Sequence, residues 1–306
     1  GCRTAVGALP LTRVPVAAVA ASAALAVFAA LAVTACSGGL PKSVAAAPTL
    51  SVVTGLWPLA QAATEIGGDK VAVDDVIPPG TDPLAFEPDA AASRIARAAG
   101  LVLTVGGGFQ PGFERAAAGA PAVVELRSRV GGDDPYVWLD PVTMNQAVKV
   151  IADAMAQANP GAGPLYERNA AALQSEVQST GIDFSSTLST CPGTTLVTPD
   201  GAFASMAREY NLTVRVAGPA PTPETVAALR VELQSGRGAA VFSQPWVDDH
   251  GVEQVAAVAG VSVHPVDTLA SPPAPGTPAS EATYFAQMEH LLGVLSGALG
   301  CRAGNQ

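Results

Sequence analysis

The sequence lacks the motifs through which many enzymes act. Its 306 residues include only three histidines, His250, His264 and His290, and none of them is placed to act as a general base. It has no Gly-x-Ser-x-Gly, His-Glu-x-x-His or Gly-x-x-x-x-Gly-Lys pattern, which excludes the hydrolases that depend on those motifs. The glycine-rich run at residues 106–112 misses the dinucleotide-binding spacing, because Pro111 replaces the third glycine. The sequence therefore predicts a protein that is not an enzyme.

Positive charge is also scarce. Lys and Arg number 16 against 26 Asp and Glu, which gives a formal net charge of −10 at pH 7. An acidic surface disfavours nucleic acid as a partner. It can concentrate cations or simply keep the protein soluble, and charge alone does not decide between these roles.

The beginning of the chain has no acidic residue before position 36. It carries Arg3 and Arg13, an apolar run at residues 14–33, and then Val33-Thr-Ala-Cys36. The run is long enough for a membrane-spanning helix, which needs about 20 apolar residues. Small residues before Cys36 and Ser-Gly-Gly after it favour a secretory signal that is cleaved at a lipobox. We therefore expect an extracytoplasmic protein, anchored to the cell membrane by a lipid on Cys36.

Cysteine is rare, with four in the chain. Cys2 lies in the predicted signal and Cys36 is the predicted lipid site, which leaves Cys191 and Cys301. Export permits a disulfide between these two, and an even count favours it. The alternative is two buried free thiols.

Short β-branched runs alternate with helical patterns in two separate series. The first has runs at 49–54, 71–77 and 101–105 and helical patterns at 58–66 and 90–99; the second has runs at 194–198, 212–216, 239–242 and 261–266 and helical patterns at 201–210, 222–236, 252–259 and 281–299. Apolar spacings of three and four predict helices at 142–158 and 165–187 between them. The fold class is α/β: two Rossmann-like lobes with parallel sheets, joined by one long backbone helix.

The predicted domains follow from this order of elements. They are a signal peptide at 1–35, a tether at 36–48, an N-terminal lobe at 49–164, a connecting helix at 165–190 and a C-terminal lobe at 191–306. A single connecting helix limits opening to a small rocking of the lobes. We expect a ligand between the lobes, in the loops that follow the carboxyl ends of the strands.

Six segments carry a family resemblance over residues 50–300. They are IGGDKV at 66–71, PGTDPLAFEP at 79–88, GGGFQPGF at 106–113, DPYVWLDP at 134–141, DGAFASMAREYNL at 200–212 and VHPVDTL at 263–269. In order and spacing they resemble the zinc/manganese-type substrate-binding lipoproteins of bacterial ABC importers. The resemblance implies a monomeric receptor that passes a metal ion to an ABC permease in the membrane.

The ligand positions implied by this resemblance have changed. The family usually binds its metal through three histidines and one carboxylate; the matching positions here are Leu84, Tyr136, Asp200 and Asp267. Leu84 cannot bind a metal, and Tyr136 offers only a phenol oxygen. Because no histidine falls at these positions, a histidine-based zinc site of the family type is excluded.

The remaining candidate ligands are all oxygen donors. They are Tyr136, Asp200 and Asp267, with Gln244, Glu87 and Asp82 as candidate neighbours. The family implies zinc or manganese, whereas oxygen ligands favour manganese or another hard cation. The alternative is a receptor fold that has lost its metal and serves as an accessory or adhesion-type partner, or that binds a small molecule.

Overall fold

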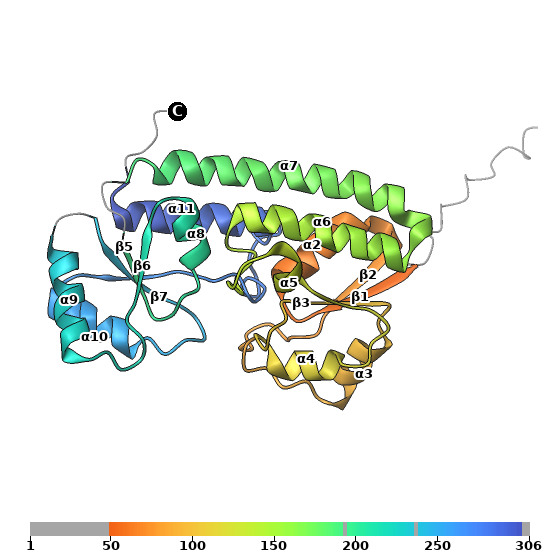
Figure 1. Cartoon of the computed structure of the whole chain (residues 1–306), viewed down its shortest axis with the longest axis horizontal. Coiled ribbons are helices and arrows are strands. Elements are labelled where there is room, and N and C mark those ends of the chain that lie inside the picture. Colours follow the sequence, from red (N-terminus) through yellow and green to blue (C-terminus); the bar gives the residue numbers. More distant parts are fainter. Residues whose placement is uncertain (1–48, 192–194, 236–237, 302–306) are drawn as a thin grey trace, which may run out of the picture. The chain divides into compact units, whose positions relative to one another are not determined.

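Two four-stranded parallel sheets organise the chain (Figure 1). The computed structural model describes residues 49–191, 195–235 and 238–301, so the predicted signal peptide, the tether and Cys36 lie outside the described residues. The first sheet has the order β2-β1-β3-β4 and the second β6-β5-β7-β8. Their strands are β1 (Leu50–Thr54), β2 (Val71–Asp75), β3 (Leu101–Thr104), β4 (Val123–Glu125), β5 (Thr195–Thr198), β6 (Thr213–Val216), β7 (Ala240–Ser243) and β8 (Val263–Pro265). The predicted fold class is confirmed; we call the two halves the N-lobe and the C-lobe.

Both faces of each sheet are buried, because helices cover them. In the N-lobe, Val53 of β1 and Val102 of β3 pack with Phe113 on one face. Their neighbours Val52 and Leu101 pack into the main core on the other face. Continuous apolar runs are typical of parallel strands buried on two sides. The first four helices of this lobe are α2 (Trp57–Gly67), α3 (Ala90–Ala98), α4 (Pro111–Ala117) and α5 (Leu126–Val130), with a 3-10 turn at Gly68–Lys70, and α6 (Pro141–Ala158) follows them.

The helix α6 (Pro141–Ala158) shows how local sequence starts an element. Pro141 stands at its first turn, where no backbone N–H is needed, and the Asp140 side chain accepts from the Val142 N–H at 3.0 Å. From there Met144, Val148 and other residues spaced by three and four are buried. A 3-10 turn at Pro160–Ala162 separates α6 from α7.

The helix α7 (Gly163–Leu188) contacts elements of both lobes: α2 and α6 from the N-lobe and α11 from the C-lobe (Figure 1). It fits the predicted long connecting helix, although it begins and ends two residues earlier than 165–190. The other C-lobe helices are α8 (Ala204–Glu209), α9 (Pro223–Gln234), α10 (His250–Ala259) and α11 (Tyr284–Leu299). None of the helices in the described ranges is long and apolar enough to cross a membrane.

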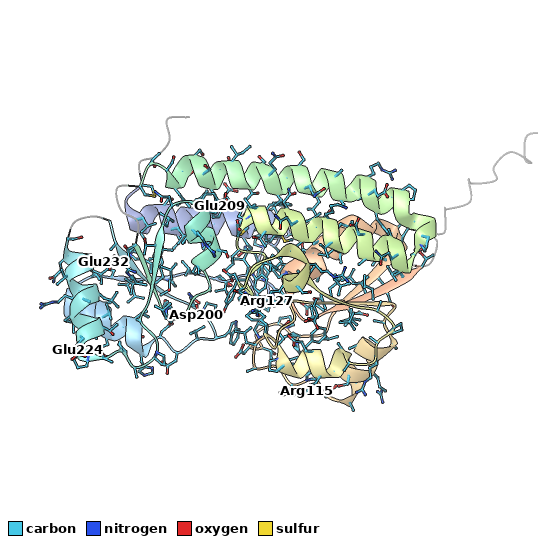
Figure 2. All side chains as sticks on the ribbon, viewed as in Figure 1. Arg115, Arg127, Asp200, Glu209, Glu224 and Glu232 are labelled. Carbon is cyan, nitrogen blue, oxygen red and sulfur yellow. A yellow bond between two sulfur atoms is a disulfide. The ribbon has the colours of Figure 1, made fainter. Side chains whose placement is uncertain are left out.

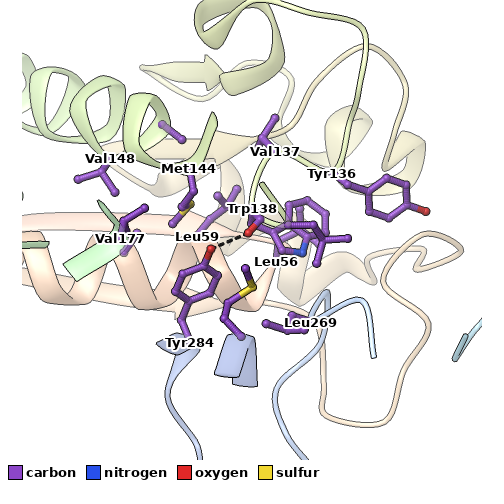
Figure 3. Packing of buried hydrophobic residues seen from close by; sticks show 14 of the residues in the cluster. Leu56, Leu59, Tyr136, Val137, Trp138, Met144, Val148, Val177, Leu269 and Tyr284 are labelled. Carbon is purple, nitrogen blue, oxygen red and sulfur yellow. Dashed lines mark hydrogen bonds between the residues drawn. The ribbon is translucent and has the colours of Figure 1, made fainter. Parts of the chain in front are cut away.

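The main core continues from one lobe to the other. Trp138 is fully buried, its indole N–H donates to the Thr268 carbonyl at 2.7 Å, and its own carbonyl accepts from the Tyr284 hydroxyl at 2.6 Å (Figure 3). Leu56 and Met144 pack in the same cluster. Residues from both lobes thus share one hydrophobic interior at this point.

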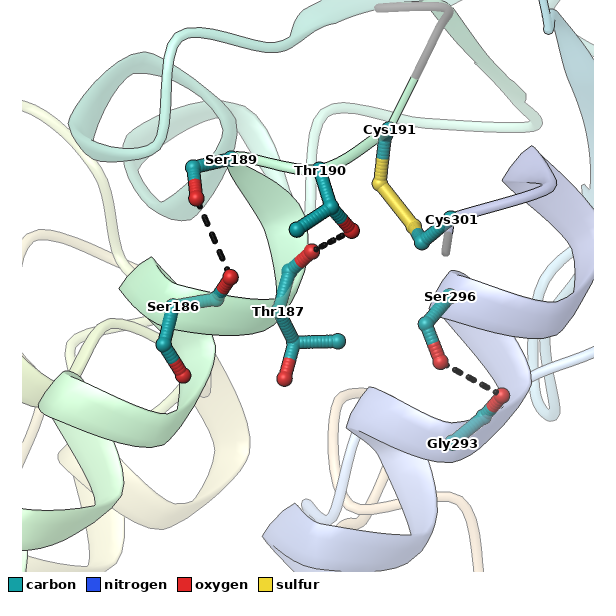
Figure 4. The surroundings of a disulfide bond; sticks show 8 residues. All are labelled: Ser186, Thr187, Ser189, Thr190, Cys191, Gly293, Ser296 and Cys301. Carbon is teal, nitrogen blue, oxygen red and sulfur yellow. Dashed lines mark hydrogen bonds between the residues drawn. A yellow bond between two sulfur atoms is a disulfide. The ribbon is translucent and has the colours of Figure 1, made fainter. Parts of the chain in front are cut away.

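A disulfide joins the two cysteines that the sequence left for pairing. Cys191, just after α7, is bonded to Cys301, just after α11 (Figure 4). The two residues are 110 positions apart in the chain. The bond therefore ties the last helix to the end of the connecting helix.

Candidate functional site

The candidate ligands lie in loops where strands end. Asp200 follows β5, Gln244 follows β7 and Asp267 follows β8. Strand β5 pairs with β7, and β7 pairs with β8, all in parallel. The loops that follow these strands therefore lie next to one another at the carboxyl end of the sheet. Tyr136 comes from the N-lobe, in the segment between α5 and α6.

Tyr136 and Asp200 contact each other directly. The Tyr136 hydroxyl donates to Asp200 Oδ2 at 2.9 Å, and Asp200 Oδ1 accepts from the Ala202 N–H at 3.0 Å. The tyrosine is 8% exposed, with its ring edge-on to Phe109 at a centroid distance of 5.2 Å. The contact joins the two lobes through one hydrogen bond.

The surroundings of Tyr136 keep its hydroxyl protonated. Burial raises its pKa well above the usual range, and the negative charge of Asp200 and its hydrogen bond raise it further. Asp134 and Asp82 act in the same direction. In the absence of a cation the phenol is therefore a neutral donor to a carboxylate.

Asp134 forms a second link between the lobes. Its Oδ1 accepts from the Tyr136 N–H at 2.9 Å, and its Oδ2 accepts from the Ser205 N–H at 2.9 Å. Asp82 caps its own loop by accepting from the Leu84 N–H at 2.8 Å. Both carboxylates hold backbone N–H groups in place by accepting their hydrogen bonds, and both add negative charge beside Tyr136.

Asp267 and Gln244 line a pocket within the C-lobe, between the ends of β7 and β8 and the helix α11. Its volume is about 510 Å³, and we call it the C-lobe pocket. Asp267 lines it; burial raises the pKa of this carboxyl, while the Leu269 N–H, which donates at 2.7 Å, and the nearby His290 lower it.

Gln244 is the most deeply placed polar residue of this pocket. It is 3% exposed, and neither its amide oxygen nor its amide nitrogen has a hydrogen-bond partner among the described residues. Buried amides without partners are rare in folded proteins, because each such atom costs free energy. The Gln244 side chain is therefore a buried polar group beside the pocket whose hydrogen bonds the described residues leave unmade.

Asp249 also lines the pocket, although the sequence did not suggest it. Its Oδ1 accepts from the Gln244 N–H at 3.3 Å. Burial raises the pKa of Asp249, and the hydrogen bond from the backbone N–H of Gln244 lowers it. The negative charges of Glu253, Asp248 and Asp200 raise it further. Asp200 therefore lies near enough to act on Asp249. The only signal in the sequence was an acidic residue five positions after Gln244.

The structure does not bring all the candidates together. Glu87 is engaged elsewhere: both of its oxygens accept from Arg115 at 2.7 and 2.8 Å, and its side chain is 68% exposed. Figure 2 places Arg115 on α4, away from Asp200. Glu87 therefore pairs with a cation 28 positions along the chain and does not line the C-lobe pocket, and its place beside the site stays a prediction.

The side chains that the structure describes do not form a set that could coordinate a metal ion. Within these ranges, no three His, Cys, Asp or Glu side chains stand close enough to hold an ion. His250 bonds to Asp248 at 2.7 Å on the surface, and His264 lies beside the Phe242 ring. The candidates form two neighbouring groups, Tyr136 with Asp200 and the residues of the C-lobe pocket.

Comparison with known proteins identifies the family. The family model described as zinc-uptake complex component A, periplasmic, matches residues 52–298. The chain belongs to this family. The fold is also seen in a solved structure: the chain superposes on the periplasmic zinc binding protein TroA from Treponema pallidum with a TM-score of 0.72, at 20% identity, covering 83% of this chain and 100% of that one.

Two curated relatives place the chain within the family. It is 26% identical over 210 residues to the zinc-binding lipoprotein AdcA of Streptococcus pneumoniae, covering 60% of this chain and 42% of AdcA. It is 24% identical over 251 residues to the manganese ABC transporter substrate-binding lipoprotein PsaA of Streptococcus pneumoniae, covering 72% of this chain and 80% of PsaA. The match thus spans about two fifths of AdcA and most of PsaA.

Proposed function

We propose that the protein is the extracytoplasmic solute-binding component of an ABC-type metal importer, and that it is not an enzyme. Family membership and the names of AdcA and PsaA support this role. The partners would be a membrane permease and the metal ion, and the receptor would act as a monomer. A lipid on Cys36 would hold it at the membrane, as the names of both relatives suggest for those proteins.

The cation in this proposal is a hard one, manganese rather than zinc. One observation carries the choice: the candidate ligands, which are Tyr136 with Asp200 and, in the C-lobe pocket, Gln244, Asp249 and Asp267, offer only oxygen atoms, apart from the Gln244 amide nitrogen. Zinc prefers nitrogen and sulfur ligands, whereas manganese, magnesium and calcium prefer carboxylate and carbonyl oxygens. His290 is the one imidazole that lines the pocket.

Capture in this scheme occurs in the acidic region between the lobes. Asp200 and Asp249 supply negative charge next to the C-lobe pocket, and no described Lys or Arg lines that pocket. Binding would close the lobes slightly, because α7 contacts both lobes and restricts a wider motion. The closed receptor would dock both lobes on the permease and release the ion there.

Thermal unfolding of the chelator-stripped protein with Mn²⁺, Zn²⁺ and Fe³⁺ added separately tests the proposal. We expect Mn²⁺ to raise the melting temperature in a concentration-dependent manner. Asp267→Asn should remove most of this rise, because it deletes a charge that lines the pocket. Asp183→Asn, at an exposed position on α7, is the matched control and should leave it unchanged.

The contrary results are equally defined. A rise with Zn²⁺ alone would show that the oxygen-only argument selects the wrong ion. No shift with any of the three ions would refute cation binding and leave a receptor fold without a metal.

A further inference from the structure

Every second residue of the N-lobe segment 134–138 forms a hydrogen bond to the C-lobe. The three bonds are Asp134 with the Ser205 N–H at 2.9 Å, the Tyr136 hydroxyl with Asp200 at 2.9 Å, and the Trp138 indole with the Thr268 carbonyl at 2.7 Å. We call this row of bonds the interlobe seam. Because all three come from one short segment, they hold the same two surfaces together.

The two ends of the interlobe seam differ in burial. Trp138 is fully buried in the core that both lobes share, and Figure 3 shows it among the core side chains, with the Tyr136 ring at their edge. Asp134 at the other end is half-buried, and it lines a cavity of about 310 Å³ together with Tyr136 and Ser205. The lobes can therefore separate at the Asp134 end while they stay joined at Trp138.

Electrostatic repulsion favours such a separation. Three carboxylates act on the Tyr136 hydroxyl through their charge: Asp200, Asp134 and Asp82. Asp200 belongs to the C-lobe and the other two belong to the N-lobe, so their negative charges repel one another across the boundary between the lobes. Arg208 lines the same cavity, but it donates to a serine hydroxyl of its own helix α8. The hydrogen bonds of the interlobe seam oppose this repulsion.

The middle bond of the interlobe seam joins two positions at which the family resemblance implies metal ligands. A cation bound to both Tyr136 and Asp200 would bridge the lobes. Here the phenol hydrogen forms the bridge instead, and a hydrogen bond to a charged acceptor is stronger than one between neutral groups. The other oxygen of Asp200 accepts from the Ala202 N–H at 3.0 Å. Both oxygens of this carboxylate are therefore engaged without a cation.

We propose that the hydrogen bond between Tyr136 and Asp200 is a latch that holds the lobes closed when no cation is bound. The lobes pivot about the buried Trp138, so the latch and the bond between Asp134 and Ser205 break together. A cation that uses Asp200 must first break the latch. It enters the open form, from which the slight closure of the proposed function follows. The latch itself does not depend on which cation binds, or on whether one binds.

The backbone amide of Ser205 reports directly on the latch. Ser205 lies in the first turn of α8 (Ala204–Glu209), where a backbone N–H has no partner within the helix. Its N–H donates to Asp134 of the other lobe. Hydrogen exchange of this amide therefore measures how often the lobes separate. The His250 N–H, which donates to Asp248 within the C-lobe at 3.0 Å, serves as the reference amide.

Hydrogen exchange followed by nuclear magnetic resonance, with a chelator present throughout, tests the proposal on the wild type and two variants. Tyr136→Phe should speed exchange at Ser205 roughly tenfold or more, because a hydrogen bond to a charged group is lost while the repulsion remains. The rate at His250 should not change. Tyr166→Phe is the matched control: its buried hydroxyl accepts from Asn159 at 3.1 Å, away from the interlobe seam, and its loss should leave the Ser205 rate unchanged.

Three results would overturn the latch. The first is a Ser205 rate that Tyr136→Phe does not alter. The second is equal acceleration in Tyr166→Phe, because exchange would then follow overall stability and not separation of the lobes. The third is a wild-type Ser205 amide that exchanges as fast as in an unstructured chain. Because these measurements exclude metal, failure of the latch is distinguishable from failure of the proposed function, which depends on added cations.

Discussion

Gln244→Met should make the ligand-free protein more stable. The wild-type residue is 3% exposed and buries an amide oxygen and an amide nitrogen without described partners. An unsatisfied buried polar group costs about 1–3 kcal/mol. Methionine has a similar length and volume and no group that needs a hydrogen bond, so the substitution avoids a cavity. The expected gain in unfolding free energy is therefore about 1–3 kcal/mol.

Scanning calorimetry and urea unfolding of the metal-free protein measure this gain. For a protein of this size, about 1 kcal/mol corresponds to a shift of roughly 2–4 °C in the melting temperature. Gln254→Met, at an exposed position on α10, is the control and should stay within about 0.5 kcal/mol of the wild type. A Gln244→Met protein that unfolds at a lower urea concentration than the wild type would refute the reasoning, because the amide would then be making bonds that stabilise the fold.

Three further predictions concern stability. Tyr136→Phe removes the hydrogen bond to Asp200 at 2.9 Å and should lower the unfolding free energy by about 1–3 kcal/mol in urea titrations; an unchanged midpoint would mean that the bond adds nothing. Burial raises the pKa of Asp75 from 3.8 to about 6. Between these two pH values the folded chain keeps the Asp75 carboxyl protonated, whereas the unfolded chain does not. The unfolding free energy should therefore fall, by up to about 3 kcal/mol, as pH rises from about 4 to about 6. Asp75→Asn should flatten that part of the pH profile, and an unaltered profile would assign it to other groups. Replacing Cys191 and Cys301 together by serine opens a link between residues 110 positions apart and should cost about 2–4 kcal/mol, while treatment of the wild type with a reductant should reproduce the loss.

The long elements of the fold could be predicted from sequence, and several short ones could not. Helices α6 and α7 have apolar residues at spacings of three and four over several turns, which is a strong signal. The strand β4 (Val123–Glu125) and the helix α5 (Leu126–Val130) were not predicted, because three to five residues carry too little periodicity. The start of α11 was placed at residue 281, whereas Thr283 caps the helix by accepting from the Ala286 N–H at 3.2 Å.

The candidate site was only partly predictable for a similar physical reason. The family resemblance placed Tyr136 and Asp200 at ligand positions, and the structure puts them in contact. Asp249 could be found only once the pairing of β7 with β8 brought the walls of the C-lobe pocket together. The ion pair that engages Glu87 depends on how α4 packs, which no local pattern records.

The metal content of the protein after equilibration with equal concentrations of Mn²⁺ and Zn²⁺ tests the central claim most directly. The chelator-stripped protein would be dialysed against both ions, separated from free metal and analysed for each metal per chain. A receptor selective for a hard cation predicts about one Mn²⁺ per chain and little Zn²⁺, because its ligand set and geometry must then outweigh the generally higher affinity of Zn²⁺ for a given site. Retention of Zn²⁺ in preference to Mn²⁺, or of neither ion, would contradict it.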